Sequence, residues 1–173
     1  QKFSPKRVLI INTFGIGDVL FTTPLISNLR ENYPDIYIGY VSNRRTAPIL
    51  QANPKINKVF VYERDEFCEG QGRSRMSYWQ RCWGLKNEIK NERFDLVIDV
   101  SLNSGTSFLT MLAGIKHRIG FNYKNRSRFL THKMPLEGYE GKHMVDFYLG
   151  ILDEIGVPVK TRALEMTISQ DDR

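Results

Sequence analysis

Residues 8–24 constrain the fold more than any other part of the chain. The first four, Val8–Ile11, are apolar and three of them are β-branched, which predicts a buried strand. Gly15 and Gly17 then allow a tight turn where a ligand can approach the backbone. Asp18 follows at the expected start of a helix, where a carboxylate is favoured. A strand, a glycine turn and a helix in this order place Asp18 at the carboxyl edge of a parallel sheet, where open α/β sheets bind ligands.

Segments with strand character alternate with segments with helix character along the rest of the chain. Strands are predicted over residues 8–12, 36–41, 58–62, 95–100 and 116–121, with a short sixth strand over 128–132. Helices are predicted over 18–32, 44–51, 77–91, 104–113 and 143–155, and a long loop over 63–75. Pro24 is expected to kink the first helix or to restart it with Thr23 as the cap. The alternation predicts one α/β domain, with a doubly wound, Rossmann-like, mostly parallel sheet.

The glycine turn does not match the two common nucleotide-binding loops. A dinucleotide site would carry a third glycine where Leu20 stands, and an acidic residue at the end of the second strand, which instead ends at Ser42. A P-loop would continue with Gly-Lys-Ser or Gly-Lys-Thr, and this turn does not. From spacing alone, Asp18 is either a helix cap or a catalytic carboxylate.

Short motifs recur along the chain in a characteristic order. They are Gly-x-Gly-Asp-Val-Leu-x-Thr-Thr-Pro at 15–24 with Leu29-Arg30 and Tyr33-Pro34, then residues 47–54, 94–99 and 118–121, and His143-Met144-Val145-Asp146 before Gly156-Val157. In order and spacing they resemble glycosyltransferase family nine, the ADP-heptose–lipopolysaccharide heptosyltransferases. The resemblance covers about the whole chain, but only the first half of such an enzyme.

The resemblance implies the GT-B fold, in which two Rossmann-like domains face each other across a cleft. Residues 1–173 would form the N-terminal, acceptor-side domain, and the C-terminal nucleotide-sugar-binding domain would be absent from this chain. The implied reaction is inverting transfer of a heptose-like sugar from ADP-heptose to a lipopolysaccharide core acceptor, with Asp18 as the base that such a displacement needs. The fragment alone is then expected to be inactive. The alternative is a stand-alone Rossmann-like nucleotide-binding or regulatory module without transferase activity.

Residues around the turn are candidates for contacts with the acceptor. Gly15 and Gly17 would let the sugar approach the backbone, and Thr13 and Thr22 would donate hydrogen bonds to it, with packing as the alternative for Thr22.

The charge distribution adds arginines to the candidates for acceptor binding. The net charge is +6, and residues 100–136 carry six Lys or Arg and no Asp or Glu. Such a local excess attracts anionic partners, and arginine binds phosphates and carboxylates in a bidentate manner. The alternative for each residue is a solvated surface charge. The candidates from this window are Arg118, Arg126 and Arg128. The family resemblance adds Arg73 and Arg75 in the long loop, because it implies a variable basic insertion after the third strand.

The sequence predicts neither a metal nor another cofactor. His117, His132 and His143 are scattered without a carboxylate at ligand spacing, and we interpret His143 as structural. Cys68 and Cys82 lack metal or redox spacing and are expected to be free thiols in a reducing compartment. The aromatic residues Tyr78, Trp79 and Trp83 beside Phe67 would suit a lipid or a sugar, but their helical spacing favours a core position.

The expected partners are a nucleotide-sugar donor, held through the missing domain, and an anionic glycolipid acceptor. Nucleic acid is not expected, because the aromatic residues within 100–136 form no recognised RNA-binding platform. No apolar run is long enough for a membrane span, and the N-terminal residues are not those of a signal peptide. We expect a cytoplasmic protein whose basic face is drawn to the inner membrane surface. The polar last residues and the missing initiator Met suggest a piece of a longer protein.

Overall fold

In the described part of the chain the sheet has six strands, all parallel. The computed structural model describes residues 4–63, 75–124, 127–136 and 143–166. The strands are β1 (Arg7–Ile11), β2 (Tyr37–Ser42), β3 (Lys58–Val61), β4 (Leu96–Asp99), β5 (His117–Asn122) and β6 (His132–Pro135). Their order is β3-β2-β1-β4-β5-β6. The order reverses between β1 and β4, which opens a crevice at the carboxyl ends of these two strands. The predicted doubly wound, Rossmann-like α/β fold is confirmed.

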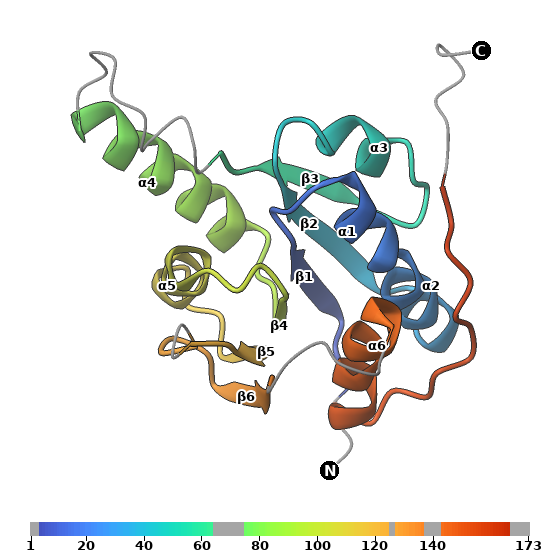
Figure 1. Ribbon diagram of the computed structural model, residues 1–173. Coiled ribbons are helices and arrows are strands. Elements are labelled where there is room, and N and C mark those ends of the chain that lie inside the picture. The colour runs from blue at the N-terminus through green and yellow to red at the C-terminus, as the bar shows by residue number, and fades with distance from the viewer. Residues whose placement is uncertain (1–3, 64–74, 125–126, 137–142, 167–173) are drawn as a thin grey trace.

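Helices cover both faces of the sheet (Figure 1). They are α1 (Ile16–Phe21), α2 (Thr23–Asn32), α3 (Ala47–Gln51), α4 (Arg75–Asn91), α5 (Ser104–Leu112) and α6 (Met144–Glu154). Helices α1, α2 and α6 pack on one face, and α4 and α5 pack on the other.

Successive side chains of β1 point alternately into two hydrophobic cores, one on each face of the sheet. Val8 and Ile10 belong to the core beneath α1, α2 and α6, whereas Leu9 and Ile11 belong to the core beneath α4 and α5. All four are at most 1% exposed. The apolar run of β1 thus reflects a strand buried on both faces, as parallel sheets require.

The helix predicted over 18–32 is two helices with a break at Thr22. Pro24 lacks the N–H that would bond the Leu20 carbonyl, and the Thr23 hydroxyl donates to that carbonyl instead, at 2.7 Å. The restart is confirmed, but the second helix begins at Thr23 and its cap is Thr22, one residue earlier than predicted. The sixth strand also differs, since it spans 132–135 and not 128–132.

Strands β4 and β5 approach each other closely at Gly120. A Cβ placed on this residue would lie 2.3 Å from the Asp99 carbonyl oxygen and 3.0 Å from a Leu130 methyl carbon. No side chain fits at this distance, so a glycine is required for the backbone spacing beneath the crevice.

Residues 157–166, here named the strap, run along α2 without regular secondary structure (Figure 1). Asn32 donates to the Pro158 carbonyl at 2.8 Å. Near the other end of the strap, Lys55 Nζ lies 2.6 Å from the Glu165 carboxylate, and the Glu165 N–H donates to the Thr23 hydroxyl at 2.9 Å. The strap is therefore attached to the domain at several points along its length.

Candidate functional site

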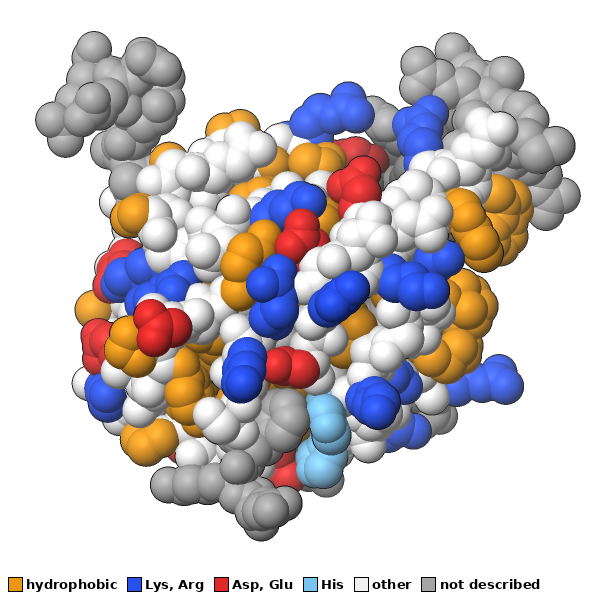
Figure 2. Space-filling view, turned by 180° about the vertical axis from the view of Figure 1, so that it is seen from behind, with side chains coloured by type: hydrophobic (Ala, Val, Ile, Leu, Met, Phe, Trp, Pro, Cys, Tyr) orange, Lys and Arg blue, Asp and Glu red, His pale blue; other side chains and the backbone are white. Residues whose placement is uncertain are grey.

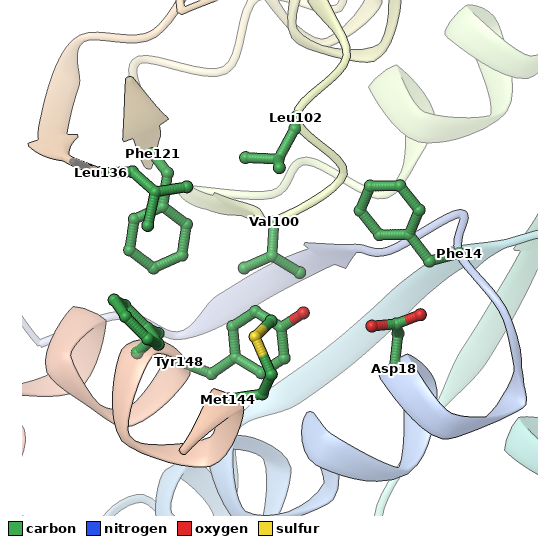
Figure 3. Close-up of a pocket in the computed structure, with 9 residues that line it drawn as sticks. Phe14, Asp18, Val100, Leu102, Phe121, Leu136, Met144 and Tyr148 are labelled. Carbon is green, nitrogen blue, oxygen red and sulfur yellow. The ribbon is translucent and has the colours of Figure 1, made fainter. Parts of the chain in front are cut away.

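A cavity of about 320 Å³ opens at the carboxyl edge of the sheet (Figure 3). It lies where the strand order reverses, which is the ligand-binding position of open α/β sheets. Its lining residues come from the β1–α1 turn, α1, the carboxyl ends of β4 and β5, the segment after β6, and α6. They are Phe14, Asp18, Val100, Leu102, Phe121, Leu136, Met144, Phe147 and Tyr148.

Asp18 is the only charged residue among these lining residues. It stands in the first turn of α1, is partly exposed, and turns its carboxylate into the cavity (Figure 3). No hydrogen bond or ion pair joins this carboxylate to another residue of the described ranges. The predicted position at the mouth of the sheet is therefore what the structure shows, and both carboxylate oxygens are available to a ligand.

The walls of the cavity are apolar. Phe121 and Val100 form its floor at the ends of β5 and β4, and Tyr148 extends from α6 (Figure 3). Leu102 has a φ of 53°, in the left-handed region that a leucine rarely adopts. A wall of this kind suits the C–H face of a ligand, with few polar groups to orient it.

Two asparagines fix the turn that carries Asp18. Asn12 Oδ1 accepts from the Phe14 N–H at 3.0 Å, and its Nδ2 donates to the Asp18 carbonyl at 3.1 Å. Asn43, after β2, donates to the carbonyls of Thr13 and Phe14 at 3.2 and 2.7 Å. Neither residue was predicted to hold this turn. The only signal was a polar Asn12 directly after four apolar residues at the end of a strand.

The two glycines of the turn are exposed and open. A Cβ added to Gly15 or Gly17 would meet nothing within 4 Å, and neither residue has a positive φ. Neither internal packing nor backbone conformation requires a glycine here. The approach of a ligand to this backbone stays a prediction, and the structure leaves space for it.

The two predicted threonine contacts lie outside the cavity lining. Thr22 is fully buried and donates to the Val19 carbonyl, so the prediction that it binds an acceptor is wrong. Packing, the alternative, is its role. Thr13 is half-buried at the turn and offers its carbonyl to Asn43.

Of the predicted arginines, Arg118 and Arg128 have described side chains, and neither lines the cavity. Arg118 is wrong as an acceptor ligand, because it lies near the amino end of β5, at the opposite edge of the sheet from Asp18. Its guanidinium donates to the Phe129 carbonyl at 2.8 Å and to the Ile115 carbonyl, and partial burial lowers its pKa. Arg128 is exposed in the β5–β6 connection and lies over the Phe129 ring, 5.7 Å from its centre.

The remaining arginine candidates are not tested by the described residues. Arg73 and Arg126 lie outside the described ranges, and Arg75 begins α4 with its side chain undescribed. From behind, the Lys and Arg side chains are scattered over the surface with Asp and Glu among them (Figure 2).

The two tryptophans of α4 are exposed, so their predicted core position is wrong, whereas Phe67 and the side chain of Tyr78 lie outside what the structure describes. Trp79 and Trp83 are 62% and 60% exposed. Lys86 Nζ lies 3.7 Å from the centre of the Trp83 ring. The residues that face the sheet from α4 are Cys82, Leu85 and Ile89.

The described residues hold neither a cluster of metal-ligand side chains nor a helix that could span a membrane. There, no three His, Cys, Asp or Glu side chains lie together as a metal site would need. None of the helices in these ranges combines the length and apolar character of a membrane span. Cys82 is a free thiol, and Cys68 lies outside the described ranges. His143 caps α6 by accepting from the Val145 N–H, in agreement with a structural role.

A buried carboxylate supports the wall of the cavity from behind. Asp99, at the end of β4, accepts hydrogen bonds from the Ser101 N–H and hydroxyl and from the hydroxyls of Thr106 and Ser107. Burial raises the pKa of this carboxyl, and the four hydrogen bonds oppose the rise. The bonds to Ser101 hold the segment that carries Val100 and Leu102.

Comparisons with known proteins agree with one another. A family model described as glycosyltransferase family 9 (heptosyltransferase) matches residues 82–173. Lipopolysaccharide heptosyltransferase 3 of Escherichia coli is 27% identical over 146 residues, which are 82% of this chain and 40% of that protein. Lipopolysaccharide core heptosyltransferase OpsX of Haemophilus influenzae is 24% identical over 172 residues, 98% of this chain and 46% of that protein.

Solved structures show the same fold. A glycosyltransferase family 9 protein of Veillonella parvula superposes with a TM-score of 0.78 at 23% identity, covering 96% of this chain and 46% of that one. The E. coli heptosyltransferase WaaC with ADP-2-deoxy-2-fluoro heptose superposes with a TM-score of 0.74 at 20% identity, covering 90% and 50%. The chain spans less than half the length of the curated relatives it matches.

Proposed function

Because the chain belongs to glycosyltransferase family 9, the heptosyltransferase family, we propose that residues 1–173 are the acceptor-side domain of an inverting heptosyltransferase. The family resemblance of the sequence is confirmed by the family model and the relatives. The donor we propose is ADP-heptose, supported by the ligand of the solved relative, and the acceptor is a lipopolysaccharide core. A second domain, beyond this chain, would hold the nucleotide.

The observation that carries the proposal is the unpaired Asp18 carboxylate facing an apolar cavity. In the proposed reaction an acceptor hydroxyl oxygen attacks the anomeric carbon of the donor, and its proton passes to Asp18. The bond from that carbon to the ADP oxygen breaks, and ADP leaves with the electron pair. A carboxylate is a sufficient base, because the proton becomes acidic as the oxygen attacks.

The cavity walls support a role in acceptor binding. Phe14, Phe121 and Tyr148 offer ring surfaces to the C–H face of a sugar, and Asp18 then meets a hydroxyl at its edge. None of the described lining residues is basic, so this cavity does not favour the alternative of a module that binds a nucleotide by its phosphates.

The anionic groups of the acceptor would be bound outside this cavity. Arg73, Arg75, Arg126 and Arg128 remain our candidates, and charge reversal at Arg73 or Arg126 is expected to raise the acceptor KM while sparing donor binding. The chemistry proposed for Asp18 uses no metal. We also propose a cytoplasmic location with peripheral contact to the inner membrane surface, since the acceptor is a lipid-linked molecule.

The test is Asp18→Asn in the full-length enzyme, with transfer from ADP-heptose to a lipopolysaccharide core fragment as the assay. We expect kcat to fall by about 10²–10⁴-fold, while the thermal unfolding midpoint and ADP-heptose binding stay near wild type. Asp153→Asn, an exposed aspartate of α6, is the matched control and is expected to keep full activity. Near-wild-type turnover of Asp18→Asn would rule out Asp18 as the base.

A further inference from the structure

Three polar side chains are buried beneath the helix that carries Asp18. Asn12 directly follows β1, Tyr40 lies in β2, and Thr22 joins α1 to α2. Each is 0% exposed. Burial of polar groups costs free energy unless their hydrogen bonds are made, so the bonds of this cluster are informative.

The Thr22 hydroxyl donates its single hydrogen to the Val19 carbonyl, at 2.7 Å. Thr22 Oγ1 also lies 2.7 Å from the Tyr40 hydroxyl, which must therefore be the donor in this pair. Burial raises the pKa of Tyr40, and the neighbouring Thr22 and Asn12 oppose the rise only in part, so the phenol keeps its proton at neutral pH. Strand β2 is thus joined to the end of α1 through Tyr40 and Thr22.

Asn12 joins β1 to the start of the same helix. Its Nδ2 donates to the Asp18 carbonyl, and its Oδ1 accepts from the Phe14 N–H. The two bonds span the glycine turn, so this side chain, together with Asn43, fixes the position of Asp18 relative to the sheet. Val19, the next residue, is held by Thr22 from the other side.

Helix α1 has only six residues, too few to be stable through its own hydrogen bonds. Its placement therefore depends on contacts with the sheet. A catalytic group must be held within a fraction of an ångström of the reacting atoms, and a displacement of about 1 Å costs about 10²-fold in rate.

We propose that Asn12, Thr22 and Tyr40 are positioning residues that fix the Asp18 carboxylate relative to the attacking hydroxyl. The inference rests on the proposed role of Asp18 as the base. None of the three lines the cavity, so each acts through α1 and not by contact with substrate.

The test uses Thr22→Val combined with Tyr40→Phe in the full-length enzyme. The double change removes both hydroxyls together, so neither is left buried without its partner, and the Val19 carbonyl keeps its bond from the Thr22 N–H at 3.1 Å. We expect kcat to fall about 10–100-fold, with the KM of donor and acceptor within about threefold of wild type. Thr22→Ser, which keeps the hydroxyl, is expected to retain kcat.

Thr110→Val is the matched control. Thr110 is also 0% exposed, lies in α5 on the other face of the sheet, and donates to the Ser107 carbonyl at 2.9 Å. The Thr110→Val variant loses an equivalent hydroxyl on the other face of the sheet from Asp18, so its kcat is expected to equal that of wild type.

An unchanged kcat in the folded double variant, or an equal fall in Thr110→Val, would overturn the inference. If the double variant does not fold, Tyr40→Phe alone is measured against the same control and decides by the same criterion. Asp18→Asn is assayed in parallel. If Asp18→Asn keeps its turnover, the proposed function fails; if it loses turnover while the network variants do not, only the positioning role fails.

Discussion

Asn28 of α2 pairs with Thr161 of the strap through the same two bonds that a neighbouring strand would make. Its Nδ2 donates to the Thr161 carbonyl at 2.7 Å, and its Oδ1 accepts from the Thr161 N–H at 3.1 Å. Oδ1 also accepts from the Lys160 N–H, and Nδ2 donates to the Pro24 carbonyl at 2.7 Å. Asn28 is fully buried, so its side chain forms hydrogen bonds with four backbone groups and water does not replace it there.

Replacing Asn28 by leucine is expected to release the strap. The variant leaves the Thr161 N–H and carbonyl without partners, and we expect a loss of about 2–3 kcal/mol in the free energy of unfolding. Urea denaturation measures the loss, and amide hydrogen exchange is expected to accelerate at Lys160 and Thr161. Asn32→Ala, which removes the bond to the Pro158 carbonyl, is the milder control. Unchanged exchange at residues 160 and 161 would contradict the role of Asn28.

Gly17→Ala separates ligand approach from folding. The added methyl group meets nothing within 4 Å and replaces a glycine inside a helix, so stability is expected to rise by about 0.5–1 kcal/mol. If the acceptor approaches this backbone, its KM in the full-length enzyme is expected to rise at least about tenfold. Gly84→Ala, equally open in α4, is expected to give the same stability gain without a kinetic change. An unchanged acceptor KM in Gly17→Ala would exclude that approach.

Leu102→Gly tests the strained wall of the cavity. The left-handed backbone is unfavourable for leucine by about 1 kcal/mol but not for glycine. This gain is expected to offset the lost side-chain packing, so the thermal unfolding midpoint stays near that of wild type. Acceptor binding is expected to weaken about tenfold, because part of the apolar wall is gone. Arg93→Gly has the same φ of 53° at an exposed position and is expected to leave the kinetics unchanged. Equal acceptor KM values for the two variants would show that Leu102 makes no contact.

Glu92→Gln is expected to change the pH dependence of stability. Its carboxylate accepts from Lys58 at 2.7 Å and from Arg7 at 2.8 Å, and the Lys58 bond holds the pKa of Glu92 below its usual 4.5. A lowered carboxyl pKa adds stability that is complete above pH 4.5 and is lost as the pH falls through the folded-state value.

The free energy of unfolding of wild type is expected to exceed that of Glu92→Gln by about 1 kcal/mol at pH 7, and the difference shrinks progressively below pH 4.5. Urea denaturation between pH 3 and pH 7 measures it. Glu31→Gln, at an exposed end of α2, is the matched control for the loss of one negative charge. A gap between wild type and Glu92→Gln that is constant with pH would contradict the assignment.

The local pattern of the sequence was sufficient for the fold and for the place of Asp18. A β-branched run, two glycines and an acidic residue determine a strand, a turn and a helix start within a few positions. Long-range burial was not predictable in the same way. Thr22 is polar and follows the turn, but it is buried against Tyr40, eighteen positions later, whose hydroxyl donates a hydrogen bond to it.

The direction in which a side chain faces was the second feature that the sequence did not predict correctly. The spacing of Trp79 and Trp83 correctly predicted a helix, but it did not predict that both side chains lie on the outer face. Which face of α4 points inward depends on how the helix packs on the sheet, and this is not visible in the local sequence. Arg118 lies in the fifth strand, as predicted, but near its amino end, where its guanidinium donates to two backbone carbonyls. Arginine density along a sequence does not tell which edge of a sheet the side chains reach.

The contact at Gly120 has a consequence for how sequence variants of this protein are interpreted. Because the Asp99 carbonyl occupies the place of a side chain, even alanine at position 120 would push β5 away from β4 and shift Val100 and Phe121 with it. In a screen of all single substitutions, position 120 would then be as intolerant as Asp18 although it touches no reactant. Loss of activity at that position reports the width of the crevice, not its chemistry.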